Sequence, residues 1–192
     1  MNKLYFKDRT EEYKKECTKT LLWSLELFTS MDYIAFPSFG TLLGIVREND
    51  FIPNDDDIDI CYLSKKSNKN DIIKELCDIS NILSEMGHLH QKVRNTGQMH
   101  IKKNKENSTG FEPIGVVDVF VSWYDDNSDF WFCQWGNVGK VNLGFTMFPF
   151  RDTEIQIPID YLKILEYLFG EWETPKNEKI GNRIDRGFYL GE

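Results

Sequence analysis

Four carboxylates within five residues form the strongest chemical signal in this sequence. They are Asp55, Asp56, Asp57 and Asp59. In an extended chain, Asp57 and Asp59 project from one face while the isoleucines that alternate with them project from the other face into a core. Like charges held this close repel each other unless a cation lies between them. Because Mg2+ binds one or two carboxylates together with substrate phosphates, this spacing predicts a metal-dependent site for phosphate chemistry.

Two simpler interpretations of the acidic run are a solvated turn and a calcium loop. Pro53-Asn54-Asp55 is good turn chemistry and most aspartate runs are exposed, but surface loops rarely alternate aspartate with isoleucine. The spacing of Asp55, Asp57 and Asp59 also matches the first three ligands of an EF-hand. That motif needs glycine at its sixth position and glutamate at its twelfth, where this chain has Ile60 and Lys66. The sequence therefore excludes an EF-hand and favours metal ligands carried by a strand.

A possible phosphate-binding segment lies just upstream of the acidic run. Gly40 and Thr41 follow an apolar stretch and precede a short helix-like segment that ends at Arg47. Backbone N–H groups at the start of a helix can receive a phosphate, and an arginine adds a planar, permanently charged fork. A Gly-Thr pair alone is more typical of an ordinary helix cap. Its closeness to the aspartates makes it one half of a two-part signature.

The two segments together resemble the LicD family, which includes bacterial phosphocholine transferases and fukutin-type proteins that modify glycans with phosphodiester-linked groups. The resemblance lies in residues 40–47 (GTLLGIVR) and 51–60 (FIPNDDDIDI), and residues 148–172 are similar to the family's closing segment. It spans roughly residues 33 to 175. It implies an α/β (α+β) fold of the nucleotidyltransferase-like type, a single domain with a mixed sheet flanked by helices. The family has Trp where this chain has Asn54, so this chain lacks the ring that could stack on a nucleotide or an acceptor there.

The resemblance also implies the residues of the site. A third carboxylate on a later strand completes the Asp-x-Asp pair, and Asp118 within the apolar run 116–121 matches it. Burying an unpaired aspartate in such a run is costly, so a metal or a strong donor must compensate. The implied catalytic and metal-binding residues are Asp57, Asp59 and Asp118, with Mg2+ or Mn2+ as the cofactor.

The remaining residues of the signature receive supporting roles. Gly40, Thr41 and Arg47 are expected to hold phosphate oxygens of the donor. Asp55 and Asp56 are expected either to orient the metal ligands or to act as the general base, and the sequence does not separate these roles.

The implied reaction transfers a phospho-alcohol group, such as phosphocholine or ribitol phosphate. The nucleotide-diphospho-linked donor would be CDP-linked, and the acceptor would be a sugar hydroxyl of a glycan or glycolipid. One alternative is transfer of a nucleoside monophosphate from a nucleoside triphosphate to a hydroxyl. A catalytically silent binding module is a further alternative, which the presence of all three carboxylates disfavours.

Composition and charge fit a compact enzyme. The chain has 192 residues, 41% of them hydrophobic, which is enough for one core. A net charge of -8 argues against bulk nucleic-acid binding. A polyphosphate substrate would then be attracted locally, by metal ions and by cations such as Arg47, Arg94, Lys102 and Lys140.

Cysteine usage and hydropathy favour a cytoplasmic protein. The four cysteines form no Cys-x-x-Cys pair and are expected to be reduced thiols. The longest uncharged stretch, Tyr33 to Val46, has 14 residues, too few to span a bilayer, and the N-terminus has no apolar signal region. We therefore expect no transmembrane segment, with membrane contact only through the acceptor.

Periodicity predicts alternating helices and strands in one domain. Residues 1–32 are expected to form an N-terminal helix packed on a domain of residues 33–175, with a tail at 176–192. Further helices are expected before Arg47, after a cap at Asn68 or Asn70, and over 160–169. Strands are expected at 33–39, 57–63, 88–94, 98–103, 112–123, 129–135 and 153–158.

Three other groups of residues have simpler explanations than a site. His88, His90 and His100 do not have the spacing of a metal motif, and only His100 is a weak catalytic candidate. Arg94, Lys102 and Lys103 are more typical of a solvated basic face than of a phosphate clamp. The aromatic run 130–135 is expected to form sheet core, with a ring-stacking platform for a glycan as the alternative.

Overall fold

The computed structural model describes residues 4–91, 97–102 and 116–175. The helices in this part of the chain are η1 (Phe6–Asp8), α1 (Glu11–Ser30), α2 (Phe39–Glu48), α3 (Lys69–Glu85) and α4 (Tyr161–Phe169). The strands are β1 (Ala35–Pro37), β2 (Ile58–Leu63), β3 (Leu89–Gln91), β4 (Gln98–Ile101), β5 (Val117–Tyr124), β6 (Phe130–Phe132), β7 (Gly136–Gly139), β8 (Phe145–Phe150) and β9 (Thr153–Pro158).

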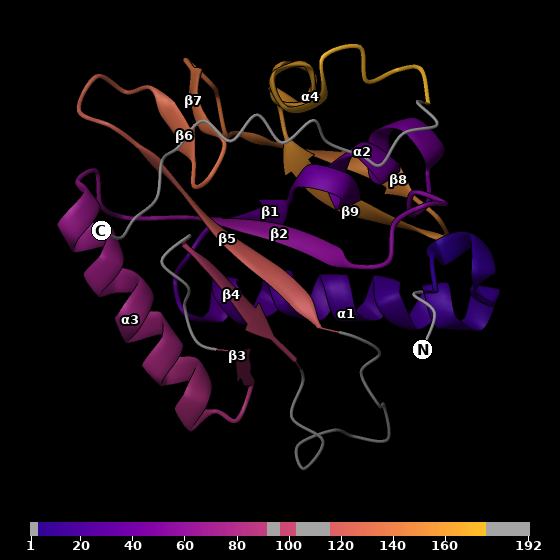
Figure 1. Cartoon of the computed structure of the whole chain (residues 1–192), viewed down its shortest axis with the longest axis horizontal. Coiled ribbons are helices and arrows are strands. Elements are labelled where there is room, and N and C mark those ends of the chain that lie inside the picture. The colour runs from indigo at the N-terminus through magenta and orange to yellow at the C-terminus, as the bar shows by residue number, and fades with distance from the viewer. Residues whose placement is uncertain (1–3, 92–96, 103–115, 176–192) are drawn as a thin grey trace.

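The strands form a mixed sheet and a separate hairpin (Figure 1). The sheet has the order β1-β2-β5-β4-β3, with β6 and β7 continuing from β5. Strands β2 and β5 are parallel, and the other neighbours are antiparallel. Strand β4 pairs with residues 117–120 of β5, and β6 pairs with residues 122–124. Strands β8 and β9 form the hairpin. The predicted α/β architecture, a mixed sheet flanked by helices, is confirmed.

Strand β2 lies between α1 and α2, with an aromatic side chain facing α1 and a carboxylate facing α2. Its Tyr62 ring is fully buried and stacks on Phe28 of α1, with ring centroids 5.3 Å apart. On the opposite face, the Asp59 carboxylate accepts a hydrogen bond from the backbone N–H of Gly40 in α2. Because side chains alternate along a strand, β2 anchors itself through its apolar face and points Asp59 towards α2.

Most predicted elements are present with small changes at their ends. Helix α1 begins after Thr10, whose hydroxyl accepts the N–H of Tyr13, and α3 begins after Asn68, whose side chain accepts the N–H of Asp71. The paired strands β3 and β4 match the predicted hairpin. Residues 92–96 of that hairpin, residues 103–115 and the predicted tail at 176–192 lie outside the described residues.

Two predictions of local structure are wrong. The strand expected at 33–39 ends at Pro37, and Gly40 and Thr41 lie inside the first turn of α2 rather than in a turn before it, because Ser38 already acts as the helix cap. The strand expected at 129–135 contains only β6, which ends at Phe132, and β7 follows outside the predicted range. Gln134 in the turn and Gly136 at the start of β7 adopt positive φ angles of 71° and 90°, which reverse the chain. Among the described helices, none is both long and apolar enough to cross a membrane.

Candidate active site

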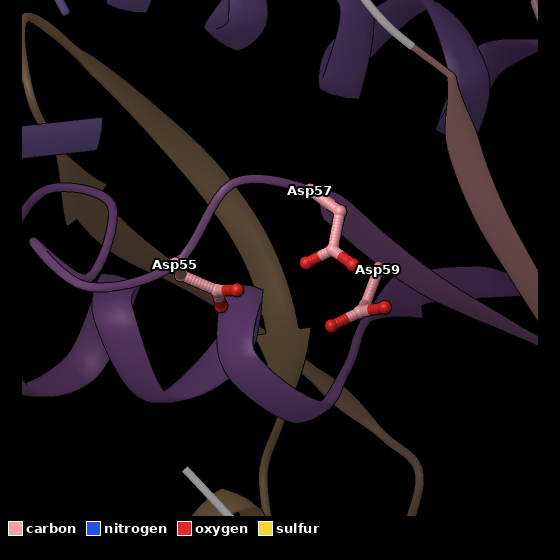
Figure 2. A group of neighbouring side chains, drawn as sticks. All are labelled: Asp55, Asp57 and Asp59. Atoms are coloured by element: carbon pink, nitrogen blue, oxygen red, sulfur yellow. The ribbon is translucent and has the colours of Figure 1, made fainter. Parts of the chain in front are cut away.

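Three aspartates converge where the loop after α2 enters β2. One oxygen from each of Asp55, Asp57 and Asp59 lies within 4.8 Å of the others. Figure 2 shows the carboxylates of Asp57 and Asp59 side by side at the start of the strand, with Asp55 beside the first turns of a helix. Three carboxylates at this separation provide the hard oxygen ligands that Mg2+ and Ca2+ prefer. The geometry therefore fits a divalent cation.

The electrostatics of these aspartates also fit a cation. Burial, followed by the charges of Asp57, Asp55 and Asp118, raises the pKa of Asp59 well above its usual range, and the Gly40 N–H lowers it only in part. Burial and the neighbouring Asp57 raise the pKa of Asp55 to about 8. Burial is the largest cause of both pKa shifts, and repulsion from the neighbouring carboxylates is the next. A bound divalent ion would oppose both causes by stabilising the ionised carboxylates.

Helix α2 is fitted closely against these carboxylates. The Thr41 hydroxyl oxygen accepts a hydrogen bond of 2.8 Å from the Asp59 backbone N–H, and the Ser38 N–H donates to the Asp59 carbonyl at 3.1 Å. Thr41 is only 3% exposed. In this structure Thr41 therefore fixes the start of β2, and its role towards a donor phosphate stays a prediction. A Cβ atom on Gly40 would lie 2.2 Å from Asp55 Oδ2, so the carboxylate occupies space that only glycine leaves free.

The loop that carries Asp55 is held by a segment far away in the sequence. The Phe6 N–H donates to the Asp55 carbonyl at 2.7 Å, and the Lys7 N–H donates to the Pro53 carbonyl at 2.9 Å. The buried Phe6 ring stacks on Phe51, with centroids 4.4 Å apart. Sequence reasoning missed this support, since a three-residue 3-10 helix has no periodic pattern to reveal it.

A fourth carboxylate joins from the neighbouring strand. Asp118 of β5 is the register partner of Asp59 in the parallel β2–β5 pair, and its charge contributes to the raised pKa of Asp59. Its two oxygens are held from β4. Gln98 Nε2 donates to Oδ2 at 2.8 Å, and His100 Nδ1 lies 3.4 Å from Oδ1. Sequence reasoning missed Gln98; its spacing of two from His100 on an expected strand was the available signal.

The other predicted site residues have different surroundings. Arg47 pairs with Glu48 at 2.7 Å and donates to the Trp172 carbonyl at 3.1 Å, which ties α2 to the segment after α4. Asp56 is not one of the three clustered aspartates, although its N–H donates to the Asp55 carboxylate. The phosphate-binding role of Arg47 and the supporting role of Asp56 stay predictions.

The remaining candidates do not gather at one place. His88 is buried and packs edge-on against Trp23, whereas His100 contacts Asp118. Lys140 pairs with Asp129, and Lys102 is exposed. Arg94 and Lys103 lie outside the described residues, as does the side chain of His90. Of the histidines whose side chains are described, His88 and His100 therefore have different surroundings and do not form a common metal site.

The fold is that of a nucleotidyltransferase-type domain. The family model described as LicD/FKTN/FKRP, nucleotidyltransferase domain, matches residues 34–160, and this chain belongs to that family. The match begins after α1 and ends before α4, so Phe6, which holds the loop that carries Asp55, lies outside the matched residues.

A solved structure is also similar to this chain. It is the crystal structure of the lincosamide antibiotic adenylyltransferase LnuA with lincomycin bound, at 16% identity and a TM-score of 0.47. The similarity covers 85% of this chain and 86% of that one. No curated protein matches the sequence.

Proposed function

We propose that this protein is a metal-dependent phosphotransferase that moves a phospho-alcohol group from a CDP-linked donor to a sugar hydroxyl of a glycan or glycolipid. The observation that carries the proposal is the convergence of Asp55, Asp57 and Asp59 beside Asp118, where burial and the neighbouring carboxylates raise the pKa of Asp59. Membership of the LicD/FKTN/FKRP family supports transfer chemistry of this kind. The identity of the donor and acceptor comes from the family resemblance.

The cation site would consist of Asp57, Asp59 and Asp118, with the Asp55 carboxylate next to the ion. A bound Mg2+ or Mn2+ would neutralise charge on the donor diphosphate and favour the ionised acceptor hydroxyl. Asp118 is already oriented for this task by Gln98 and His100, and Asp59 by Gly40. These contacts keep the carboxylates in place before any substrate binds, which is what electrostatic preorganisation requires.

The bond changes of the reaction are those of a single phosphoryl transfer. The acceptor oxygen forms a bond to the phosphorus that carries the alcohol, while the bond from that phosphorus to the bridging oxygen breaks and CMP leaves. The acceptor proton must pass to a base. We assign this role to Asp55 in preference to Asp56, since Asp55 lies in the carboxylate cluster and Asp56 does not.

Product analysis tests the proposal directly. The purified protein should be incubated with Mg2+ and either a CDP-linked alcohol or a nucleoside triphosphate, with a simple sugar as the acceptor, and the products identified by phosphorus NMR. Release of CMP supports phospho-alcohol transfer. Release of pyrophosphate from a triphosphate supports nucleotidyl transfer instead. If neither appears, or if Asp118→Asn gives the same products as the wild type, the proposal fails.

A further inference from the structure

A partly exposed tryptophan lies at the edge of the candidate active site. Trp135 is in the tight turn between β6 and β7, and its ring centroid lies 4.0 Å from that of Phe39 and 5.3 Å from that of Phe120. Phe39 and Phe120 are almost fully buried, whereas Trp135 is only partly buried. The three rings therefore form one contiguous aromatic group, with tilted and edge-on contacts, whose outer member is Trp135.

This aromatic group adjoins the carboxylates through two elements. Phe39 immediately precedes Gly40, whose N–H holds the Asp59 carboxylate. Phe120 follows Asp118 by two residues on the same strand, so both side chains lie on one face of the sheet. The position of Trp135 beside both residues places an indole ring next to the proposed phosphate chemistry.

The backbone at two residues around these rings adopts left-handed conformations. Phe39 has a φ angle of +47°, and Gln134, next to Trp135, has a φ angle of +71°. Bulky residues rarely adopt left-handed conformations, and such conformations concentrate at functional sites. The Trp135 N–H donates to the Phe132 carbonyl at 3.3 Å, so Gln134 takes a turn position usually given to glycine.

The turn also has an unused hydrogen-bond donor and is held from two sides. Within the described part of the chain, Gln134 Nε2 is buried and has no hydrogen-bond partner. The Cys133 N–H donates to the Val121 carbonyl, and the Tyr167 hydroxyl of α4 donates to the Trp135 carbonyl at 2.7 Å. A buried donor left unpaired is costly, which suits a group that binds an acceptor supplied by a ligand.

From these observations we infer that the 133–135 turn binds the nucleobase of the donor, with Trp135 stacking on the base and Gln134 donating to one of its ring acceptors. The inference rests on the proposed function, because it needs a nucleotide whose phosphates lie at the aspartates. Nucleobases suit this site since every base has a π-face for an indole and a carbonyl or ring nitrogen for an amide N–H.

Calorimetry of two ligands separates base binding from phosphate binding. CDP and inorganic pyrophosphate should each be titrated, with Mg2+ present, into the wild type, Trp135→Leu and Trp135→Phe. We expect Trp135→Leu to weaken CDP binding by about tenfold or more, the range typical of losing one base–aromatic stack. Pyrophosphate binding and the stabilisation by Mg2+ should not change. Trp135→Phe should retain most of the CDP affinity.

Trp131→Leu is the matched control. Trp131 pairs with Trp123 on the opposite face of the sheet and should be equally costly to truncate, yet CDP affinity should stay at the wild-type value. Wild-type CDP affinity in Trp135→Leu, or an equal loss for CDP and pyrophosphate, would overturn the inference. If the wild type binds neither CDP nor pyrophosphate in the presence of Mg2+, the proposed function itself is wrong. This outcome is distinct from the two that overturn the nucleobase inference.

Gln134→Gly gives a second, independent test. Glycine adopts a positive φ without strain, so a purely structural turn should become more stable and bind CDP unchanged. If Gln134 donates to the base, the variant should be at least as stable as the wild type but bind CDP more weakly, with pyrophosphate binding unaffected. Unchanged CDP affinity in this variant would remove Gln134 from the subsite.

Discussion

The Asp55 carboxylate lies in the space that a side chain at Gly40 would occupy: a Cβ atom there would be 2.2 Å from Asp55 Oδ2. The same glycine donates its backbone N–H to Asp59. One residue of α2 therefore positions two carboxylates, one through its hydrogen bond and one through its missing side chain. The glycine of the sequence signature acts on the aspartates directly, whether or not it also contacts a phosphate.

Gly40→Ala should weaken metal binding without destabilising the fold. The clash falls on the end of a flexible side chain, so Asp55 can turn away, and alanine is the better helix former by up to about 1 kcal/mol. We expect the free energy of unfolding to stay within about 1 kcal/mol of the wild type. The rise in melting temperature on adding Mg2+ should shrink.

Gly44→Ala is the control for this change. Its Cβ atom would lie 2.6 Å from the Asp50 carbonyl oxygen, so backbone must move. We expect a loss of roughly 1–3 kcal/mol in stability, as for overpacking in general. The Mg2+ response should remain. A loss of stability with an unchanged Mg2+ response in Gly40→Ala, and the reverse in Gly44→Ala, would show that Gly40 has only a structural role.

The metal-free protein should become less stable as the pH rises from about 4 to about 8. The ordinary pKa of an aspartate is 3.8, and burial and Asp57 raise that of Asp55 to about 8, so the folded state holds a proton that the unfolded chain has released. The folded state thus binds more protons in this window, and the free energy of unfolding must fall with rising pH. Asp59 contributes in the same direction.

Thermal unfolding in EDTA and in Mg2+ across that window measures this effect. With saturating Mg2+, the melting temperature should fall less as the pH rises, because the ion takes the place of the proton. In EDTA, Asp55→Asn should reduce the fall in melting temperature. A melting temperature in EDTA that is constant or rises from pH 5 to 8, with no difference between wild type and Asp55→Asn, would contradict the raised pKa.

Phe6→Leu should affect the metal site from outside the family domain. The ring stacks on Phe51, and the Phe6 N–H holds the Asp55 carbonyl. We expect the free energy of unfolding to fall by about 1–2 kcal/mol, near the cost of core substitutions that leave little cavity. The rise in melting temperature on adding Mg2+ should be smaller than in the wild type. Phe28→Leu, which removes a buried ring packed on Tyr62, should cost a similar amount but keep the Mg2+ shift. Equal Mg2+ responses in the two variants would argue against a positioning role for Phe6.

Asp118→Asn should abolish transfer while leaving the fold intact. The amide is nearly isosteric, and its oxygen can still accept the Gln98 hydrogen bond. Circular dichroism should show a wild-type fold, and phosphorus NMR should show no product. Asp152→Asn, at an exposed turn, is the control and should retain activity. Near wild-type turnover in Asp118→Asn would mean that the third ligand lies elsewhere.

The elements with a regular period could be predicted from the sequence, and those set by single backbone angles could not. The alternation of Asp57, Ile58 and Asp59 indicated a strand, and β2 is present from Ile58 on, with Asp59 inside it and Asp57 just before it. The turn at Gln134 was missed because a positive φ at glutamine leaves no trace in composition.

Long-range contacts account for the other features of the site that could not be predicted from local sequence patterns. The pairing of Asp118 with Asp59 depends on the parallel register of β2 and β5, and here the family resemblance named the residue before the register was known. No local pattern joins Arg47 to residue 172 or Phe6 to Asp55. Such contacts depend on tertiary packing rather than on the spacing of neighbours.

A Mg2+ titration of the wild type and of the double variant Asp57→Asn/Asp59→Asn, followed by melting temperature, tests the central claim most directly. If the ion binds the folded site and not the unfolded chain, the wild type should gain about 2.7 kcal/mol at 100 times the dissociation constant. The double variant should show no gain, and its metal-free form should be as stable as the wild type or more so, since repulsion is relieved. A wild-type melting temperature that stays constant into the millimolar range, or an equal rise in the double variant, would contradict a metal site at these aspartates.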